Sequence, residues 1–321
     1  MSDRKVIAVD LGGTHIRVAV ASKSGRLDCH TRIATQAELG PLSVIERMAD
    51  QINKTAAEAS LDTSVAVGVA SPGPLNPSAG AVLYTPNLPG WRDVKFVELL
   101  EARVGRKVFL ANDGNCGALG EIRFGSARGV NDLIYLALGT GVGGGIVSGG
   151  RLIDGVRGLG AEVGHLCIAI DGPRCSCGSI GCLEAYVSGW AIQREAEAVA
   201  TTADGDRIRD LAGDGEIHAG IVALAADEGD PAAKLILDRA GRALGAAMGA
   251  LTNIFNPRMI VVGGGVASIG EHLLGPARES MLAYSFIDMR EDVTIAKSSL
   301  GGDTGVYGAA ALAFEKLGQD F

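Results

Sequence analysis

The chain has 321 residues, 47% hydrophobic and 21% charged, a mixture that suits a globular protein with a sizeable core and excludes a largely disordered one. Its net charge of −8 argues against sequence-independent binding to nucleic acid or to an anionic membrane, since binding to either of these needs a basic face. The length favours two lobes, and no apolar run suits a membrane span or a signal peptide. We therefore expect a cytoplasmic protein of two lobes that binds a small molecule and neither nucleic acid nor membrane.

A glycine turn near the N-terminus joins two predicted strands. Residues 6–10 form an apolar run, and the alternation over residues 16–20 has the period of a strand. A glycine turn between strands can be an ordinary hairpin, but its N–H groups also suit phosphate oxygens, and an aspartate beside it can hold Mg²⁺ through water. The candidate residues are Asp10 for Mg²⁺ and, for phosphate, Asp10, Gly12, Gly13 and Thr14.

The next elements place a polar pair at a strand end. Residues 41–60 have one apolar helical face, formed by Leu42, Ile45, Met48, Ala49 and Ile52. A buried strand is expected at 65–70, followed by proline-rich and glycine-rich loops at 71–77 and 85–91. Asn112 and Asp113 follow a strand at 108–111 and precede a helical pattern, and ligands of open α/β sheets bind at strand carboxyl ends.

A second glycine turn repeats the plan of the first. A strand at 133–138 runs into Gly139, Thr140 and Gly141, and a further strand follows. These residues also match a dinucleotide-binding pattern, but that site needs a helix next, and the segment 145–150 cannot supply one. A Walker-type phosphate loop is absent from the sequence. The repeat favours a second phosphate turn and suggests two related halves.

The remaining elements complete the second half. Helices are predicted at 182–200, 231–255 and 306–316, and small residues along 231–255 permit close helix packing. An apolar strand at 259–262 ends in Gly263, Gly264 and Gly265. We divide the chain into an N-terminal α/β lobe, residues 1–113 plus 306–321, and a C-terminal α/β lobe, residues 114–305.

A histidine and three cysteines have the spacing of a metal site. His165 is followed by Cys175, Cys177 and Cys182, which supply one imidazole and three thiolates for a tetrahedral Zn²⁺ site. Four protein ligands leave no open position, so the zinc would be structural. Buried free cysteines are the alternative, and we interpret Cys29, Cys116 and Cys167 in that way, with Cys167 the first substitute should a ligand be misassigned. The cysteine pattern also fits a reducing compartment.

These motifs together resemble the ROK family of sugar kinases and repressors along essentially the whole chain. The family's phosphate motifs are similar to residues 10–14 and 138–145, its adenosine motif to residues 262–266, and its zinc signature to residues 164–184. The resemblance implies an α/β, two-lobed, ribonuclease H-like and actin-like ATPase fold with a ligand cleft between the lobes. It also implies a homodimer or a homotetramer.

The resemblance implies an ATP-dependent hexokinase that uses ATP, Mg²⁺ and a structural Zn²⁺. Asp113 would accept the proton of the hexose 6-hydroxyl as that oxygen attacks the γ-phosphorus. The nucleotide contacts would include Gly139, Thr140, Gly141, Gly263, Gly264 and Gly265. The implied sugar contacts are Gly73, Asn87, Asn112, Asp113, Glu162, His165 and Glu184.

Other functions of the same family remain open. Glucose is the expected hexose from the resemblance to bacterial glucokinases, with N-acetylmannosamine, N-acetylglucosamine and fructose as alternatives, and polyphosphate could replace ATP. Some members are sugar-responsive repressors with an N-terminal helix-turn-helix domain. Only nine residues precede Asp10 here, too few for that domain, and the acidic charge agrees, so we expect an enzyme. A noncatalytic actin-like binding protein would not need the Asn112–Asp113 pair.

Overall fold

The chain forms two compact units. The structure is a computed structural model that describes residues 4–85 and 88–318. Asn87, a predicted sugar contact, lies outside the described residues. The first unit comprises Met1–Gly129, Arg151–Ala161 and Ser299–Phe321, and the second comprises Val130–Gly150 and Glu162–Ser298. The first unit extends beyond Asp113 because helix α3 (Asp113–Arg123) packs against helix α10 (Thr304–Lys316).

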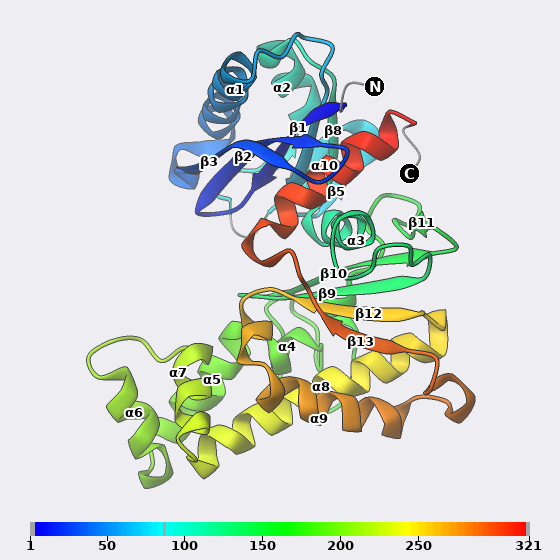
Figure 1. Ribbon diagram of the computed structural model, residues 1–321. Coiled ribbons are helices and arrows are strands. Elements are labelled where there is room, and N and C mark those ends of the chain that lie inside the picture. The colour runs from blue at the N-terminus through cyan, green and yellow to red at the C-terminus, as the bar shows by residue number, and fades with distance from the viewer. Residues whose placement is uncertain (1–3, 86–87, 319–321) are drawn as a thin grey trace. The chain divides into compact units, whose positions relative to one another are not determined.

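The first unit is built on a five-stranded sheet with the order β3-β2-β1-β4-β8 (Figure 1). The first two strands form the predicted antiparallel hairpin, whereas β4 and β8 add in parallel on the other side of β1. Parallel neighbours need crossover connections, which the helices supply. The strands are β1 (Lys5–Leu11), β2 (His15–Ser22), β3 (Leu27–Ala34), β4 (Val67–Ser71) and β8 (Val108–Asn112).

Alternate residues of β1 contribute to two different cores, because successive side chains of a strand point to opposite faces. Ile7 and Val9 pack with residues of α1 (Gly40–Glu58) and α2 (Phe96–Val104). Val6 and Ala8 pack on the other face, with residues of α10. Both faces of the sheet are therefore covered, as Figure 1 shows for the helices of this unit.

Helix α1 confirms the predicted amphipathic pattern with one exception. Ile45, Met48 and Ile52 are buried, but Leu42 is 58% exposed, so its assignment to the apolar face was wrong. The loops after β4 also contain a small antiparallel sheet that the sequence pattern did not predict, because its strands are only two to four residues long. They are β5 (Leu75–Asn76), β6 (Ala81–Tyr84) and β7 (Arg92–Val94).

The second unit repeats the hairpin followed by two parallel strands. Strands β9 and β10 are antiparallel, and β12 and β13 continue the sheet in parallel beyond β9. This is the arrangement of β2, β1, β4 and β8 in the first unit, so the suggestion of two related halves holds at the level of topology. The strands are β9 (Leu133–Leu138), β10 (Val142–Ser148), β12 (Met259–Gly263) and β13 (Thr294–Lys297), while β11 (Arg151–Leu152) follows β10 in sequence.

Among the described residues, the second unit also contains six α-helices and the loop that carries the cysteines. The helix predicted from 182 is interrupted, because Ser188 has extended backbone and its side chain caps a new helix by accepting the N–H of Ala191. The helix predicted at 231–255 has those bounds, and Asp230 caps it. The helices are α4 (Glu184–Val187), α5 (Gly189–Ala200), α6 (Asp206–Ala212), α7 (Ala219–Asp227), α8 (Pro231–Phe255) and α9 (Glu271–Tyr284).

The small residues of α8 allow it to touch α9 closely, as the sequence predicts. A Cβ atom on Gly241 would lie 2.4 Å from the carbonyl oxygen of Leu273, and one on Gly245 would lie 2.2 Å from that of Ala277. Only glycine therefore fits at these contacts. In the described part of the chain, no helix is long and apolar enough to cross a membrane.

Candidate functional site

The carboxyl ends of three parallel strands in the first unit lie at or close to predicted site residues. Asp10 of β1 lies in register with Ala70 of β4, and the next residue of β4, Ser71, lies in register with Asn112 of β8. A Cβ atom on Gly73 would lie 3.0 Å from Nδ2 of Asn112. The structure thus brings Asn112 together with the predicted sugar contact at Gly73.

Asn112, rather than Asp113, is the N-cap residue of α3. Its Oδ1 accepts the N–H groups of Gly114 and Asn115 at 2.9 and 3.4 Å. Asp113 is the first residue of the helix, and its Oδ1 accepts the N–H of Gly114 at 2.8 Å. An anionic side chain is favourable here because the helix N-terminus carries partial positive charge.

Asp10 is held from two sides. Nη1 of Arg17, its register partner on β2, donates to Oδ2 of Asp10 at 2.8 Å. Burial raises the pKa of the Asp10 carboxyl, although the Arg17 guanidinium acts in the opposite direction. On the other side, Gly305 of α10 is so close that a Cβ atom on it would lie 2.5 Å from Cγ of Asp10. This position therefore requires glycine.

The turn after β1 is tied to the neighbouring backbone. The N–H of Gly12 donates to the carbonyl oxygen of His15 at 2.9 Å, and the hydroxyl of Thr35 donates to the carbonyl oxygen of Gly12 at 2.7 Å. The N–H of Thr35 donates to the carbonyl oxygen of Thr14 at 2.8 Å. The turn is thus a hairpin, as predicted, with its start and end fixed.

The second glycine turn, between β9 and β10, is joined to Glu184, a predicted sugar contact. Oε2 of Glu184 accepts the N–H of Val142 at 2.9 Å, and Oε1 accepts the hydroxyl of Ser176 at 2.8 Å. A Cβ atom on Gly141 would lie 2.6 Å from Oε2. Glu184 is only 8% exposed, so these donors compensate for the loss of water around its charge.

A pocket of about 780 Å³ in the second unit joins two motifs that are far apart in the sequence. Gly139 and Thr140 of the glycine turn lie at its lining, as do Gly265 and Val266 from the predicted adenosine motif. Two other predicted nucleotide residues, Gly263 and Gly264, do not line it and instead lie against strand β9. A second pocket, of about 620 Å³, is lined by parts of α5, α8 and α9 and contains none of the predicted site residues.

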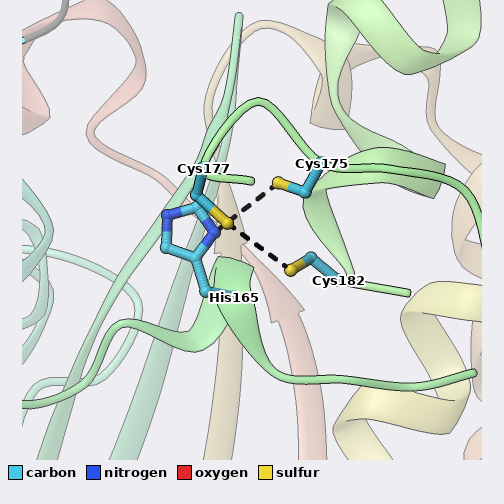
Figure 2. A group of neighbouring side chains, drawn as sticks. All are labelled: His165, Cys175, Cys177 and Cys182. Atoms are coloured by element: carbon cyan, nitrogen blue, oxygen red, sulfur yellow. Dashed lines mark hydrogen bonds between the residues drawn. The ribbon is translucent and has the colours of Figure 1, made fainter. Parts of the chain in front are cut away.

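The four predicted zinc ligands converge in the second unit (Figure 2). One ligand atom from each of His165, Cys175, Cys177 and Cys182 lies within 4.8 Å of the others. Sγ of Cys177 lies 3.8 Å from Sγ of Cys182, and Nδ1 of His165 lies 3.8 Å from Sγ of Cys175. Tetrahedral Zn²⁺ with bonds of about 2.3 Å places its ligand atoms about 3.8 Å apart, so these residues fit the ion.

The environments of the three cluster thiols differ. Burial raises the pKa of the Cys175 thiol and raises that of Cys182 to about 12. A backbone hydrogen bond from Ser179 lowers the pKa of the exposed Cys177 thiol to about 7. A metal cation would favour the thiolate form of all three.

The loop that carries these cysteines is closed at its base by backbone pairing. The N–H of Leu183 donates to the carbonyl oxygen of Leu166 at 2.9 Å, and the N–H of Ile168 donates to that of Gly181 at 2.9 Å. The segment between these residues therefore begins and ends at one place. Its cysteines are held close together without help from a distant part of the chain.

The structure corrects the interpretation of two other cysteines. Cys116 is buried, as predicted, and burial raises the pKa of its thiol. Cys167 is exposed and Cys29 is only partly buried, so neither is a core residue. Cys29 lies in β3 at the irregularity in its pairing with β2 and has positive φ, and Cys167 lies in an isolated bridge with Cys182, so the burial of neither follows from a regular sequence pattern.

Glu162, another predicted sugar contact, directly precedes a short 3₁₀ turn (Val163–His165) that ends at the predicted zinc ligand His165. The N–H of His165 donates to the carbonyl oxygen of Glu162 at 3.0 Å. Burial raises the pKa of the Glu162 carboxyl, while His165 acts in the opposite direction and Glu184 adds to the increase. The three predicted sugar contacts of this unit, Glu162, His165 and Glu184, therefore share one electrostatic environment.

Sequence reasoning missed two kinds of site residue. Ser176, a hydrogen-bond donor to Glu184, lies between two predicted zinc ligands, and that position was its only signal. Trp190, Gln193 and His218 line the larger pocket. Of these, His218 directly precedes an alanine-rich helix, the place of a capping residue, and that position could have drawn attention to it.

Comparisons with known proteins agree on one family. The model of the ROK family matches residues 6–316. A glucokinase from Thermotoga maritima is 38% identical over 99% of this chain and 100% of its own length. A crystal structure of a ROK family glucokinase from Streptomyces griseus in complex with glucose and AMPPNP is 34% identical, with a TM-score of 0.83, over 97% of this chain and 100% of that one.

A regulator is also similar to the chain. A xylose repressor from Caldicellulosiruptor bescii is 29% identical over 97% of this chain and 78% of its own length. The likeness therefore extends to both functional classes that the sequence motifs suggest.

Proposed function

Because this chain belongs to the ROK family, we propose that it is an ATP-dependent glucokinase that phosphorylates the 6-hydroxyl of glucose. The observation that carries the proposal is the position of Asp113 directly after β8, together with a pocket that joins two of the three predicted nucleotide motifs. Glucokinases that are 34 to 38% identical over nearly the whole chain support the choice of reaction. The similar repressor is less identical, and the acidic charge of this chain does not favour DNA binding.

In this proposal Asp113 is the general base. Its carboxylate accepts the proton of the glucose 6-hydroxyl as that oxygen forms a bond to the γ-phosphorus, and the bond from that phosphorus to the oxygen of ADP breaks. The hydrogen bond from the N–H of Gly114 occupies Oδ1 and orients the side chain. The helix N-terminus favours a negative charge at this position.

The glycine turns, residues 10–14 and 139–141, would contact phosphate oxygens, and Asp10 would hold Mg²⁺ through water. When bound, Mg²⁺ neutralises charge that develops on the phosphate oxygens. Arg17 and Gly305 fix the Asp10 carboxylate before any ligand arrives. That preorganisation suits a reaction in which the protein contributes mainly positioning and charge stabilisation.

Gly73, Asn112, Glu162, His165 and Glu184 are the proposed sugar contacts among the described residues. Oε2 of Glu184, which accepts the N–H of Val142, keeps a second lone pair for a sugar hydroxyl, whereas Oε1 accepts both the hydroxyl of Ser176 and the thiol of Cys175. Nδ1 of His165 faces Cys175, so Nε2 is left to contact the sugar. A structural zinc at the cluster would therefore fix the ring of His165.

The test of the proposal is direct. Purified protein with glucose, ATP and Mg²⁺ should release ADP in a coupled assay, with glucose 6-phosphate as the product. The same assay with polyphosphate instead of ATP tests the alternative donor, and absence of any sugar-dependent ADP release would leave the repressor class as the better reading. We also propose a cytoplasmic homodimer or homotetramer, which the molar mass in solution can test.

A further inference from the structure

Helix α7 begins at an unusual cap, the side chain of His218. Its Nδ1 accepts the N–H of Gly220 at 3.1 Å. Asparagine, aspartate, serine and threonine normally have this role. Because Nδ1 is the acceptor, the proton of the neutral ring is on Nε2, which points away from that N–H. The cap therefore fixes both the tautomer and the direction of the ring.

Gly220 leaves room for the ring in that position. A Cβ atom on Gly220 would lie 3.0 Å from Cε1 and 3.1 Å from Nδ1 of His218. A side chain there would press on the imidazole. The ring thus rests against the first turn of α7, and from there His218 lines the pocket of about 780 Å³.

The residues that line the pocket are of two chemical kinds. Gly139 and Thr140 belong to the turn proposed to contact phosphate, and the carbonyl oxygen of Gly139 accepts the N–H of Gly189, the first residue of α5. The apolar side chains of Leu224 and Val266 line the pocket as well. Apolar lining suits the base of a nucleotide and not its phosphates.

We infer that the imidazole of His218 packs against the purine nucleoside part of ATP and contributes to its affinity. The inference rests on the proposed function for the identity of the nucleotide. An aromatic ring stacks well on the face of a base, and a ring already fixed by its cap loses little conformational freedom on binding. His218 is thus a nucleotide-binding residue without a part in the chemical step.

The first variant, His218→Asn, keeps a capping side chain and removes the ring. We expect the KM for ATP to rise about fivefold or more, the range of base stacking on one aromatic side chain. The Kd for AMPPNP, measured by calorimetry, should rise by the same factor. The KM for glucose and the Tm should stay unchanged, because asparagine caps helices well.

Three further variants distinguish the effect of losing the imidazole ring from the effect of losing the helix cap. His218→Phe keeps a flat ring and loses the cap, so the Kd for AMPPNP should stay close to wild type while Tm falls. Gly220→Ala crowds the ring and should weaken the binding of AMPPNP by less than His218→Asn does. Its Tm should not fall, because alanine is a better helix former than glycine. Asp230→Ala removes the cap of α8 and should lower Tm without changing AMPPNP affinity.

The outcomes distinguish this inference from the proposed function. If the wild-type protein binds AMPPNP and His218→Asn binds it equally well, the inference is wrong, whatever the protein does to glucose. Equal weakening in His218→Asn and His218→Phe, with Tm maintained, would also overturn packing by the ring. If wild-type protein fails to phosphorylate glucose, the proposed function fails, and the AMPPNP titrations still decide the role of His218.

Discussion

The carboxylate of Glu184 accepts the backbone N–H of Val142 at 2.9 Å, although 42 residues separate the two in sequence. Its other oxygen accepts the hydroxyl of Ser176, which lies between two of the proposed zinc ligands. One side chain therefore connects the cysteine loop to the start of β10, directly after the second glycine turn. A substitution that disrupts the cysteine loop should therefore also disturb the start of β10, and the reverse.

Replacement of Glu184 by alanine should reduce both stability and activity. The buried N–H of Val142 would lose its acceptor, which costs about 1–3 kcal/mol. Glu184→Gln can keep the bond to Val142 through its amide oxygen, so its Tm should stay nearer to wild type while the KM for glucose rises. Thermal melts and KM values for glucose and ATP check both variants. Equal Tm values for wild type and Glu184→Ala would show that this bond contributes little.

Asp113→Asn should abolish most turnover and spare the fold. General-base loss costs about 10² to 10⁴ in rate, or about 3–5 kcal/mol of barrier. The cap of α3 is Asn112, so the helix start should survive the substitution. The measurement is kcat, with glucose affinity by calorimetry and Tm as controls. A kcat close to wild type would remove Asp113 from the catalytic role.

Gly305→Ala should disturb Asp10, because its methyl group would lie 2.5 Å from Oδ1 of that residue. We expect the Mg²⁺ concentration needed for half-maximal rate to rise several-fold while glucose affinity is kept. Gly302→Ala is the matched control, since nothing lies within 4 Å of a Cβ atom there. The measurement is the rate of glucose phosphorylation by both variants as a function of Mg²⁺ concentration. Identical titration curves for the two variants would contradict the proposed role of Asp10.

The cysteine loop should hold one Zn²⁺ per chain. Metal analysis of protein purified without added zinc should find close to one equivalent, and Cys175→Ser should reduce that content and weaken glucose binding. Cys167→Ser is the control, because Cys167 lies next to the cluster in sequence but is not part of it. An active protein without zinc would rule out this role for the cluster.

Glucose should have a clearly higher kcat/KM than the N-acetylated hexosamines, since nothing in the sequence of the loops near Gly73 indicates an acetamide pocket. A panel of glucose, N-acetylmannosamine, N-acetylglucosamine and fructose in the coupled assay gives the ranking. A higher value for fructose or N-acetylmannosamine would overturn the glucose assignment and leave the kinase intact.

Local signals predicted most of the fold. The bounds of α8 were predicted because Asp230 and Pro231 mark its start and its apolar period is regular. The first glycine hairpin was predicted from an apolar run before the turn and alternation after it, and the second from its repetition of that plan. The break at Ser188 was missed because one extended residue hardly disturbs a helical pattern, and the strands of the small sheet are too short to show a period.

The candidate site was predictable where its residues are close in sequence and not where tertiary contacts make it. The cysteine cluster falls in one short segment, and its side chains do converge. The bond from Val142 to Glu184 and the approach of Gly305 to Asp10 join residues from separate elements. No periodicity or spacing records such contacts. The sequence position of His218 indicates a helix cap, but its place in the pocket emerges only in the folded structure.

The closed base of the cysteine loop has a consequence for how such proteins can diverge. Because the backbone of Leu166 meets that of Leu183, the segment between them can vary in sequence without moving the 3₁₀ turn that precedes it or the helix α4 that follows it. The segment can therefore be exchanged as a unit. Exchanging residues 165–183 between sugar kinases of different preference should transfer the histidine and its cysteines together, while the sheet stays unchanged.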